Sequence, residues 1–219
     1  MAQKFQTFTL AAIVTMAGAM AAAASTIDFT DEGSYTAGAS QATGTTDGTG
    51  WTLTPNPNFY FLTYSQEYDG TNDPVTTLAL ENDGVGVIRN PNSTDDEVTY
   101  PRESLTMTFA AEVEVSGFYF LDLFGRETVT VYDENNILLT VIASPWGAFD
   151  NSEGGYVYYA FDATVTSLTF VPGSSNDNRG RPDFALAAID LAPIPVPAAG
   201  LLLLTALGGL GLARRRKSA

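Results

Sequence analysis

The chain has 219 residues, with 25 aspartates and glutamates against 10 lysines and arginines, and it contains no cysteine and no histidine. This composition excludes disulfide bonds, Ser-His-Asp and Cys-His catalysis, and zinc sites that need His or Cys ligands. The formal charge of −15 also disfavours nucleic acid as a partner, because phosphate binding needs clustered cations.

The N-terminus has the features of a secretory signal peptide. Lys4 precedes a mostly apolar stretch over Phe8–Ala23, and the small residues Ala22 and Ala24 suit cleavage by a signal peptidase. We expect residues 1–24 to form a signal helix that directs export and is then removed. An ordinary N-terminal helix is the alternative.

Residues 25–192 form the body of the chain, and they are strongly acidic. They hold all 25 acidic residues and only five arginines, a formal charge of −20 without a single lysine. Such a surface suits salty water, where self-repulsion is screened. The simplest interpretation is a solubility charge on an exported protein.

The body is expected to fold as a series of short strands. Segments rich in β-branched and aromatic residues recur every ~8–12 residues between turn signals, and no segment keeps a helical period. The small, polar stretch Ala37–Gly50 is expected to be a loop. The expected strands are Thr26–Phe29, Trp51–Thr54, Phe59–Tyr64, Val75–Leu80, Val85–Ile88, Leu105–Phe109, Glu112–Val115, Phe118–Leu123, Thr128–Tyr132, Ile137–Ile142, Tyr156–Phe161, Thr166–Val171 and Phe184–Leu191.

This pattern predicts an all-β fold, an antiparallel jelly-roll-like β-sandwich over residues 25–192. In such domains the first and last strands often pair. That pairing would bring Asp28 near Asp190.

Oxygen-rich acidic clusters make calcium the one cofactor that the sequence leaves open. None of the clusters matches the EF-hand spacing, so a solvated acidic loop is the alternative for each. No other cofactor is expected. The clusters are Asp28/Asp31/Glu32, Asp95/Asp96/Glu97 and Asn176/Asp177/Asn178.

Exposed aromatic rings could stack on sugars, since their flat apolar faces suit the C–H faces of a pyranose. The candidates are Trp51, Tyr60, Tyr64, Trp146, Tyr156, Tyr158 and Tyr159, although core packing is the simpler interpretation of Trp51. A pair of carboxylates can also cleave glycosides without histidine. Among 25 acids such a pair arises by chance, so we expect no enzyme. The strand glutamates considered are Glu103, Glu112, Glu114 and Glu127. The densest positive spot in the body, Arg179 and Arg181, is expected to pair with neighbouring acids.

The C-terminus combines an apolar run with a basic cluster. Ala198–Ala213 carries no charge, and its 16 residues span roughly 24 Å as a helix at ~1.5 Å per residue. It lacks the polar face of an amphipathic helix, so we expect a minimal transmembrane helix. The cations that follow it should stay cytoplasmic and leave the body on the exported side. They are Arg214, Arg215, Arg216 and Lys217.

A proline motif, a short span and an arginine cluster in this order resemble the PEP-CTERM class of C-terminal sorting signals. The motif is similar to the VPLPA-CTERM variant, with both prolines and the alanine matching and Val196 in place of the glutamate of the parent class. It consists of Ile194, Pro195, Val196, Pro197 and Ala198. The resemblance covers about the last 26 residues.

The resemblance implies a Gram-negative bacterium and an exosortase-like membrane protease that removes residues 193–219. The protein would be exported, anchored briefly in the inner membrane, and then delivered to the cell surface or secreted. We therefore expect a non-enzymatic surface or matrix protein with a structural or adhesive body that can meet exopolysaccharide. The alternatives are a carbohydrate-binding module with structural calcium and, less favoured, a carboxylate-dependent enzyme acting on polysaccharide.

Replacing Pro195 and Pro197 with Ala should leave the protein inserted in the membrane but unprocessed, because the sorting motif is lost while the apolar span remains. Mass spectrometry of the mature protein checks both ends at once. Deleting Arg214–Lys217 is the companion change and should weaken retention in the inner membrane. Unchanged release of the proline variant into the medium would refute the sorting interpretation.

Overall fold

The computed structural model describes residues 24–57, 60–65, 76–90, 97–145, 154–173 and 181–193. They lie within one compact unit, Ala23–Pro193. The strands pair antiparallel throughout, which confirms the all-β expectation. They are β1 (Ser25–Asp28), β2 (Ala42–Thr46), β3 (Thr49–Asn56), β4 (Phe61–Tyr64), β5 (Val85–Ile88), β6 (Ser104–Leu121), β7 (Thr128–Asp133), β8 (Leu138–Ala143), β9 (Val157–Pro172) and β10 (Ala185–Leu191).

The two end segments of the chain carry predictions that lie outside the described residues. These are the signal segment before Ala24, including Ala22, and the sorting segment 194–219 with its motif, span and basic cluster. In the part of the chain that the structure describes, no helix has the length and apolarity needed to cross a membrane.

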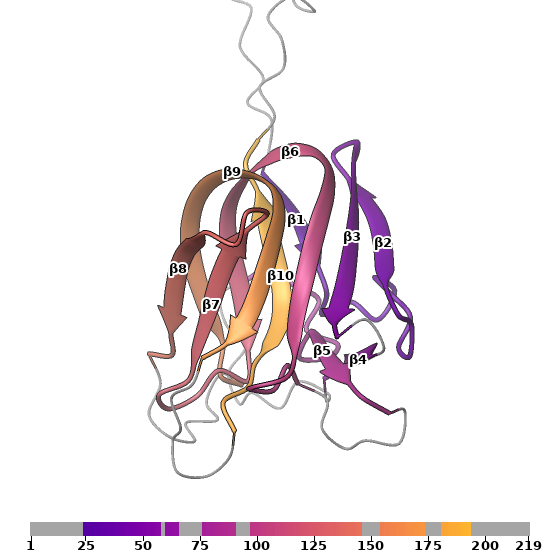
Figure 1. Cartoon of the computed structure of the whole chain (residues 1–219). Coiled ribbons are helices and arrows are strands. Elements are labelled where there is room, and N and C mark those ends of the chain that lie inside the picture. The colour runs from indigo at the N-terminus through magenta and orange to yellow at the C-terminus, as the bar shows by residue number, and fades with distance from the viewer. Residues whose placement is uncertain are drawn as a thin grey trace, which may run out of the picture. The chain divides into compact units, whose positions relative to one another are not determined.

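The long strands β6 and β9 build two layers from one sheet. The first half of β6 pairs with β3, as at Thr54↔Thr106, and the second half pairs with β10, as at Ile189↔Phe118. β9 follows β6 through both halves, with a register shift between Thr108 and Val113 of β6. Figure 1 shows both strands bending over one end of the unit. The arrangement fits a β-sandwich.

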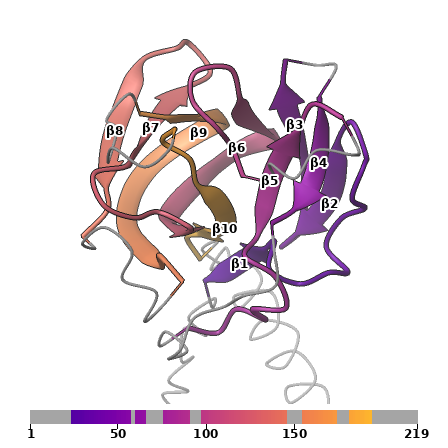
Figure 2. The ribbon, with the colours of Figure 1, turned by 90° about the horizontal axis from the view of Figure 1, so that it is seen from below.

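We call the end where β6 and β9 bend the arch end, at residues 109–112 of β6. The opposite end, where both strands begin and finish, is the loop end. One layer has the order β2-β3-β6-β9-β7-β8, and the other has β4-β5-β10-β6-β9 with β1 beside β10. Figure 2 looks at the loop end, where β4, β5 and β10 are neighbours. The connections between the layers therefore gather at the loop end.

Apolar alternation in β6 fills the space between the layers. Leu105, Met107 and Phe109 are buried, while the threonines between them face outward. In the second half, Phe118 packs edge-on against Phe170 with ring centroids 5.3 Å apart. The predicted core role of Trp51 is also confirmed, since the residue is 8% exposed and its ring centroid lies 5.7 Å from that of Phe29.

β10 is buried on both faces. Its inner face lies in the core, and its outer face is covered by residues 76–80, which have no regular secondary structure. The small residues Ala185, Ala187 and Ala188 pack with Leu78 in a separate apolar cluster on the outer face. The strand expected over Val75–Leu80 is wrong for its described part, residues 76–80. Side chains replace strand pairing there: Ala79 N donates to Asp28 Oδ2 at 2.8 Å, and Leu80 N to Thr30 Oγ1 at 2.8 Å.

A hairpin stands where a loop was expected over Ala37–Gly50. β2 pairs with β3 through a two-residue turn at Asp47-Gly48, whose φ angles of 49° and 78° suit this turn type. Gly44 lies opposite Trp51, and a Cβ there would come within 2.3 Å of the indole ring. The glycine thus lets the tryptophan lie across β2.

The predicted pairing of the first and last strands is confirmed. β1 runs antiparallel to β10 from Ser25↔Leu191, and Thr26 Oγ1 donates to Asp190 Oδ1 at 2.6 Å. Thr26 rather than Asp28 is therefore the partner of Asp190. The start of β1 and the end of β10 both lie at the arch end (Figure 1), so the first and last strands of the body begin and finish there.

Replacing Gly84 with Ala should lower the free energy of unfolding by about 3 kcal/mol or more. Gly84 has φ 102°, and an added Cβ would lie 2.5 Å from the backbone oxygen of Leu186. Gly48→Ala is the matched control, because Gly48 also has a positive φ but has nothing within 4 Å. Denaturant unfolding should show the larger loss for Gly84→Ala, and equal losses would contradict the clash.

Candidate functional site

A pocket of about 190 Å³ opens at the loop end. Each of its lining residues lies near the end of a strand: Tyr60 before β4, Arg89 after β5, Glu103 before β6 and Arg181 before β10. Because β5, β6 and β10 all have an end here, residues far apart in sequence meet. The described lining residues are Tyr60, Arg89, Thr99, Tyr100, Arg102, Glu103 and Arg181.

Hydrogen bonds from backbone N–H groups fix the segments that line the pocket. Tyr100 N donates to the carbonyl oxygen of Pro182 at 2.9 Å, which fixes the segment before β6 against the segment before β10. Thr99 N donates to Glu103 Oε2 at 2.9 Å, and Glu103 N donates back to Thr99 O at 3.2 Å. Glu103 therefore sits in a defined orientation.

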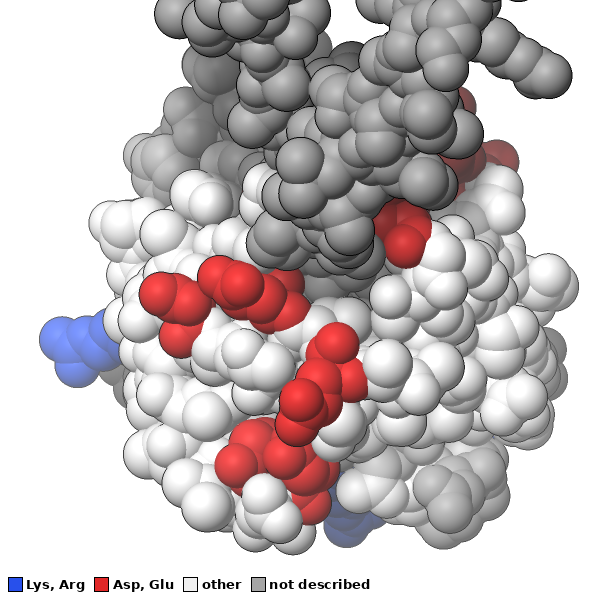
Figure 3. Space-filling view, turned by 90° about the horizontal axis from the view of Figure 1, so that it is seen from above, with Lys and Arg blue, Asp and Glu red and all other residues white. Residues whose placement is uncertain are grey.

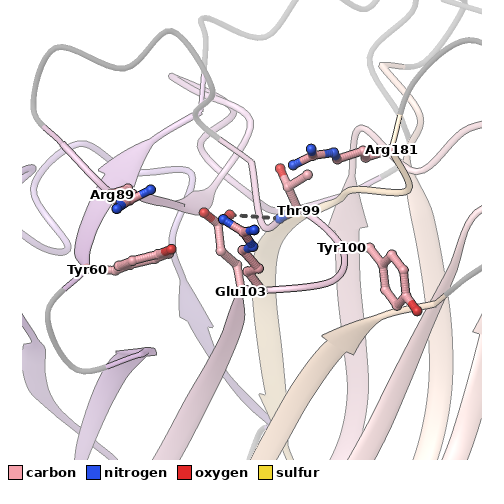
Figure 4. Close-up of a pocket in the computed structure, with 7 residues that line it drawn as sticks. Tyr60, Arg89, Thr99, Tyr100, Glu103 and Arg181 are labelled. Carbon is pink, nitrogen blue, oxygen red and sulfur yellow. Dashed lines mark hydrogen bonds between the residues drawn. The ribbon is translucent and has the colours of Figure 1, made fainter.

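The lining differs in exposure from base to rim. Tyr60 and Thr99 are 4% and 7% exposed and form the base, whereas Tyr100 is 36% exposed. The arginines are exposed, and in Figure 4 Arg89 lies on one side of Glu103 and Arg181 on the other. Guanidinium groups, an aromatic ring and a carboxylate thus share one hollow.

Charge is distributed unevenly between the two ends of the body. Three of its five arginines line the pocket at the loop end. Figure 3 looks at the arch end, where red acidic side chains cross the visible surface and blue cations appear only at its margin. Exposed acids near the bend of β6 and β9 include Glu112, Glu114 and Asp162.

A group of carboxylates surrounds Asp122, directly after β6. Burial raises the pKa of Asp122 well above its usual range, and the negative charges of Asp83 and Glu97 add to that rise, with a smaller contribution from Asp183. Ser65 Oγ opposes it by donating to Asp122 Oδ2 at 3.0 Å. The structure thus concentrates like charges in a place that sequence spacing did not reveal.

The acidic clusters proposed from sequence form turns where they are described. Asp28 Oδ1 accepts from Thr30 N at 2.8 Å, and Asp31 Oδ1 accepts from Gly33 N at 2.7 Å. Asp95, Asp96 and the Asn176/Asp177/Asn178 cluster lie outside the described residues. Among the residues that are described, no group of three acidic side chains is arranged to hold a metal ion.

The aromatic candidates divide between the core, the pocket and an outer face. Tyr60 lines the pocket, whereas the Tyr64 hydroxyl donates to the carbonyl oxygens of Glu32 and Tyr35. Trp146 lies outside the described residues. The remaining candidates are Tyr156, directly before β9, and Tyr158 and Tyr159 in β9, where the strand alternation separates them.

On the outer face of β9, Tyr158 is 46% exposed, and its ring centroid lies 4.7 Å from that of Tyr119. Tyr156 also faces Tyr119, at 6.0 Å. Tyr159 points to the other face and accepts from Thr140 Oγ1 at 2.9 Å. The tyrosine group expected from sequence is therefore split.

The four candidate glutamates lie in different parts of the fold. Glu127 is buried and accepts from Phe124 N at 2.8 Å, and Glu112 and Glu114 are exposed near the bend. Only Glu103 of the four lines the pocket. Arg181 also lines it, while Arg179 lies outside the described residues. The sequence analysis missed Arg89, Thr99, Tyr100 and Arg102, which carry no motif. Only the fold brings Arg89, after β5, to the segment 99–102 before β6.

Comparison with known proteins yields no family. No family model matches the chain, and no curated protein matches it. Among solved structures, the carbohydrate-binding module CpGH89CBM32-5 from Clostridium perfringens, in complex with GalNAc-β-1,3-galactose, is similar. The match is 14% identical, covers 64% of this chain and 95% of that one, and has a TM-score of 0.28. A likeness of this degree does not extend to a ligand or an activity.

Asp122→Asn should remove a pH-dependent loss of stability. A carboxyl group with a raised pKa in the folded state stabilises the fold below its unfolded pKa, about 4, and this contribution is lost as the pH rises through the folded value. Thermal melts from pH 4 to pH 8 should show the variant gaining about 2 °C or more over the wild type at pH 8. Asp47→Asn, on the β2–β3 turn, is the control. Parallel curves for Asp122→Asn and the wild type would contradict the assignment.

Proposed function

We propose that this chain is an exported surface or matrix protein whose jelly-roll-like sandwich binds extracellular polysaccharide through the loop-end pocket. The observation that carries the proposal is the composition of that pocket. It combines an exposed aromatic ring, Tyr100, with the hydroxyl-binding groups of Thr99 and Glu103 and with three guanidinium groups. Sugar sites use the same pairing of an apolar face with a few placed polar groups.

The position of the pocket supports the same function. β10 runs from the pocket residues before Ala185 to Leu191, beside the start of β1. At ~3.3 Å per residue, the seven residues of β10 separate the two ends by roughly 20 Å. The export signals predicted at both ends of the chain adjoin the arch end of the body in sequence. Removal of both segments would leave every described pocket residue in the mature protein.

The proposal includes no catalytic step. Glycoside cleavage by carboxylates alone needs two such groups flanking the scissile bond. Glu103 is the one carboxylate among the described lining residues. The proposal also needs no cofactor. Structural calcium stays a sequence-based prediction, which melting curves with and without calcium would check.

Tyr100→Ala should weaken polysaccharide binding about tenfold, equal to about 1.4 kcal/mol, because the stacking face is lost. Tyr158→Ala is the matched control, since Tyr158 is a similarly exposed tyrosine away from the pocket lining. The measurement is binding of the detergent-purified full chain to a panel of extracellular polysaccharides, with released sugar assayed in the same samples.

Absence of binding to every polymer in the panel would refute the proposal. Sugar release would instead identify an enzyme. Equal weakening by the two tyrosine variants would move the site away from the pocket.

A further inference from the structure

The arginines of the loop-end pocket need an explanation in a body of charge −20. Arg89, Arg102 and Arg181 come from three separate connections, after β5, before β6 and before β10. A body with only five arginines and no lysine brings three of them to one hollow. Like charges repel, so this convergence has an energetic cost that a bound anion would offset.

An internal carboxylate is the simplest alternative anion. Glu103 is the described candidate, and its Oε2 accepts the hydrogen bond from Thr99 N that Figure 4 shows. Further internal candidates are Asp95 and Asp96, which follow Arg89 in the sequence, and Glu97 and Asp183, which lie two positions from Thr99 and Arg181. The test below therefore includes Asp95 and Asp96.

We propose that the pocket recognises a carboxylate-bearing sugar, such as a uronic acid residue of an acidic polysaccharide. This inference rests on the proposed polysaccharide-binding function. Guanidinium is planar and binds a carboxylate through two parallel hydrogen bonds. The same hollow offers Tyr100 to the ring face and the Thr99 and Glu103 side chains to hydroxyl groups. A cavity of about 190 Å³ lies below the ~300–1,000 Å³ of drug-sized pockets, so it suits one sugar ring.

The overall negative charge further restricts the class of anionic polymer that can bind. The acidic arch end and the net charge of the body repel a dense polyanion such as nucleic acid. A polysaccharide with carboxylates spaced along a mostly uncharged chain avoids that repulsion and still satisfies the pocket. The recognised group is thus a local carboxylate rather than an extended line of charge.

The test measures calorimetric binding of a short oligouronate to the detergent-purified full chain, beside the same oligosaccharide with its carboxyl groups reduced to alcohols. The oligouronate should bind at least tenfold more tightly than its neutral analogue. Arg89→Gln, Arg102→Gln and Arg181→Gln should each weaken oligouronate binding about tenfold and leave binding of the neutral analogue within twofold. Arg126→Gln is the matched control, because Arg126 is exposed and lies outside the described pocket lining.

Two further measurements test which anion is preferred and whether the arginines act through their planar shape or only through their charge. Arg181→Lys keeps the charge but loses the planar fork, so it should not restore full affinity. A sulfated analogue should bind more weakly than the oligouronate, and tighter binding would overturn the carboxylate assignment. Preference for a DNA oligonucleotide would overturn it as well.

Melting temperatures test whether the arginines have a purely internal role. If Asp95→Asn with Asp96→Asn lowers the melting temperature as much as the arginine changes, and no oligouronate binds, the arginines only balance that loop and the inference fails. Equal binding of acidic and neutral oligosaccharides would overturn the inference and leave the proposed function intact. Binding of no saccharide would overturn both.

Discussion

The pairing of β6 with β9 on both sides of their bend is the constraint on which the rest of the body depends. These two strands remain hydrogen-bonded in both layers, from Leu105↔Phe170 to Phe120↔Val157. Because both bend at the same level, their four ends return to the loop end. Every other strand except β4 pairs with one of them or with a strand that does so, and β4 pairs with β5. The pocket is thus a consequence of the bend, which collects unrelated connections in one place.

The distribution of charged side chains also differs between the arch end and the loop end. Acidic side chains near the bend lie on regular, exposed strand positions, where water and salt screen them. At the loop end the backbone is irregular, and carboxylates near Asp122 lie close enough to raise its pKa. Arginines line the pocket at this end as well. The loop end therefore holds two groups of like charges, one of carboxylates and one of arginines. Perturbed ionisable groups of this kind cluster at functional sites.

Much of the fold was accessible from the sequence, since alternation in segments such as Leu105–Phe109 fixes which side chains face inward. The hairpin at Asp47-Gly48 was missed although the Asp-Gly pair is a strong turn signal, because the surrounding residues are small and polar. The segment 76–80 was misjudged because side-chain acceptors on Asp28 and Thr30 substitute for a partner strand.

The pocket was largely beyond the sequence for a different reason. Arg89 and Arg181 are 92 positions apart, and no periodicity links them. Only the strand order, which pairs β5 with β10 at Leu186↔Val85, brings their connections together. Tyr60, Glu103 and Arg181 were noted from their residue types, but nothing in the sequence placed them together. Site residues contributed by separate loops leave no local pattern.

The pairing of β1 with β10 has a mechanical consequence. Hydrogen bonds in a sheet lie perpendicular to the strands. A load applied between the end of β10 and a ligand in the pocket would run along β10, parallel to its neighbours β1 and β6. The bonds on both sides would then share that load in shear instead of opening one after another. An adhesive protein under flow, the role proposed for this chain, would gain that resistance from this geometry without a disulfide bond.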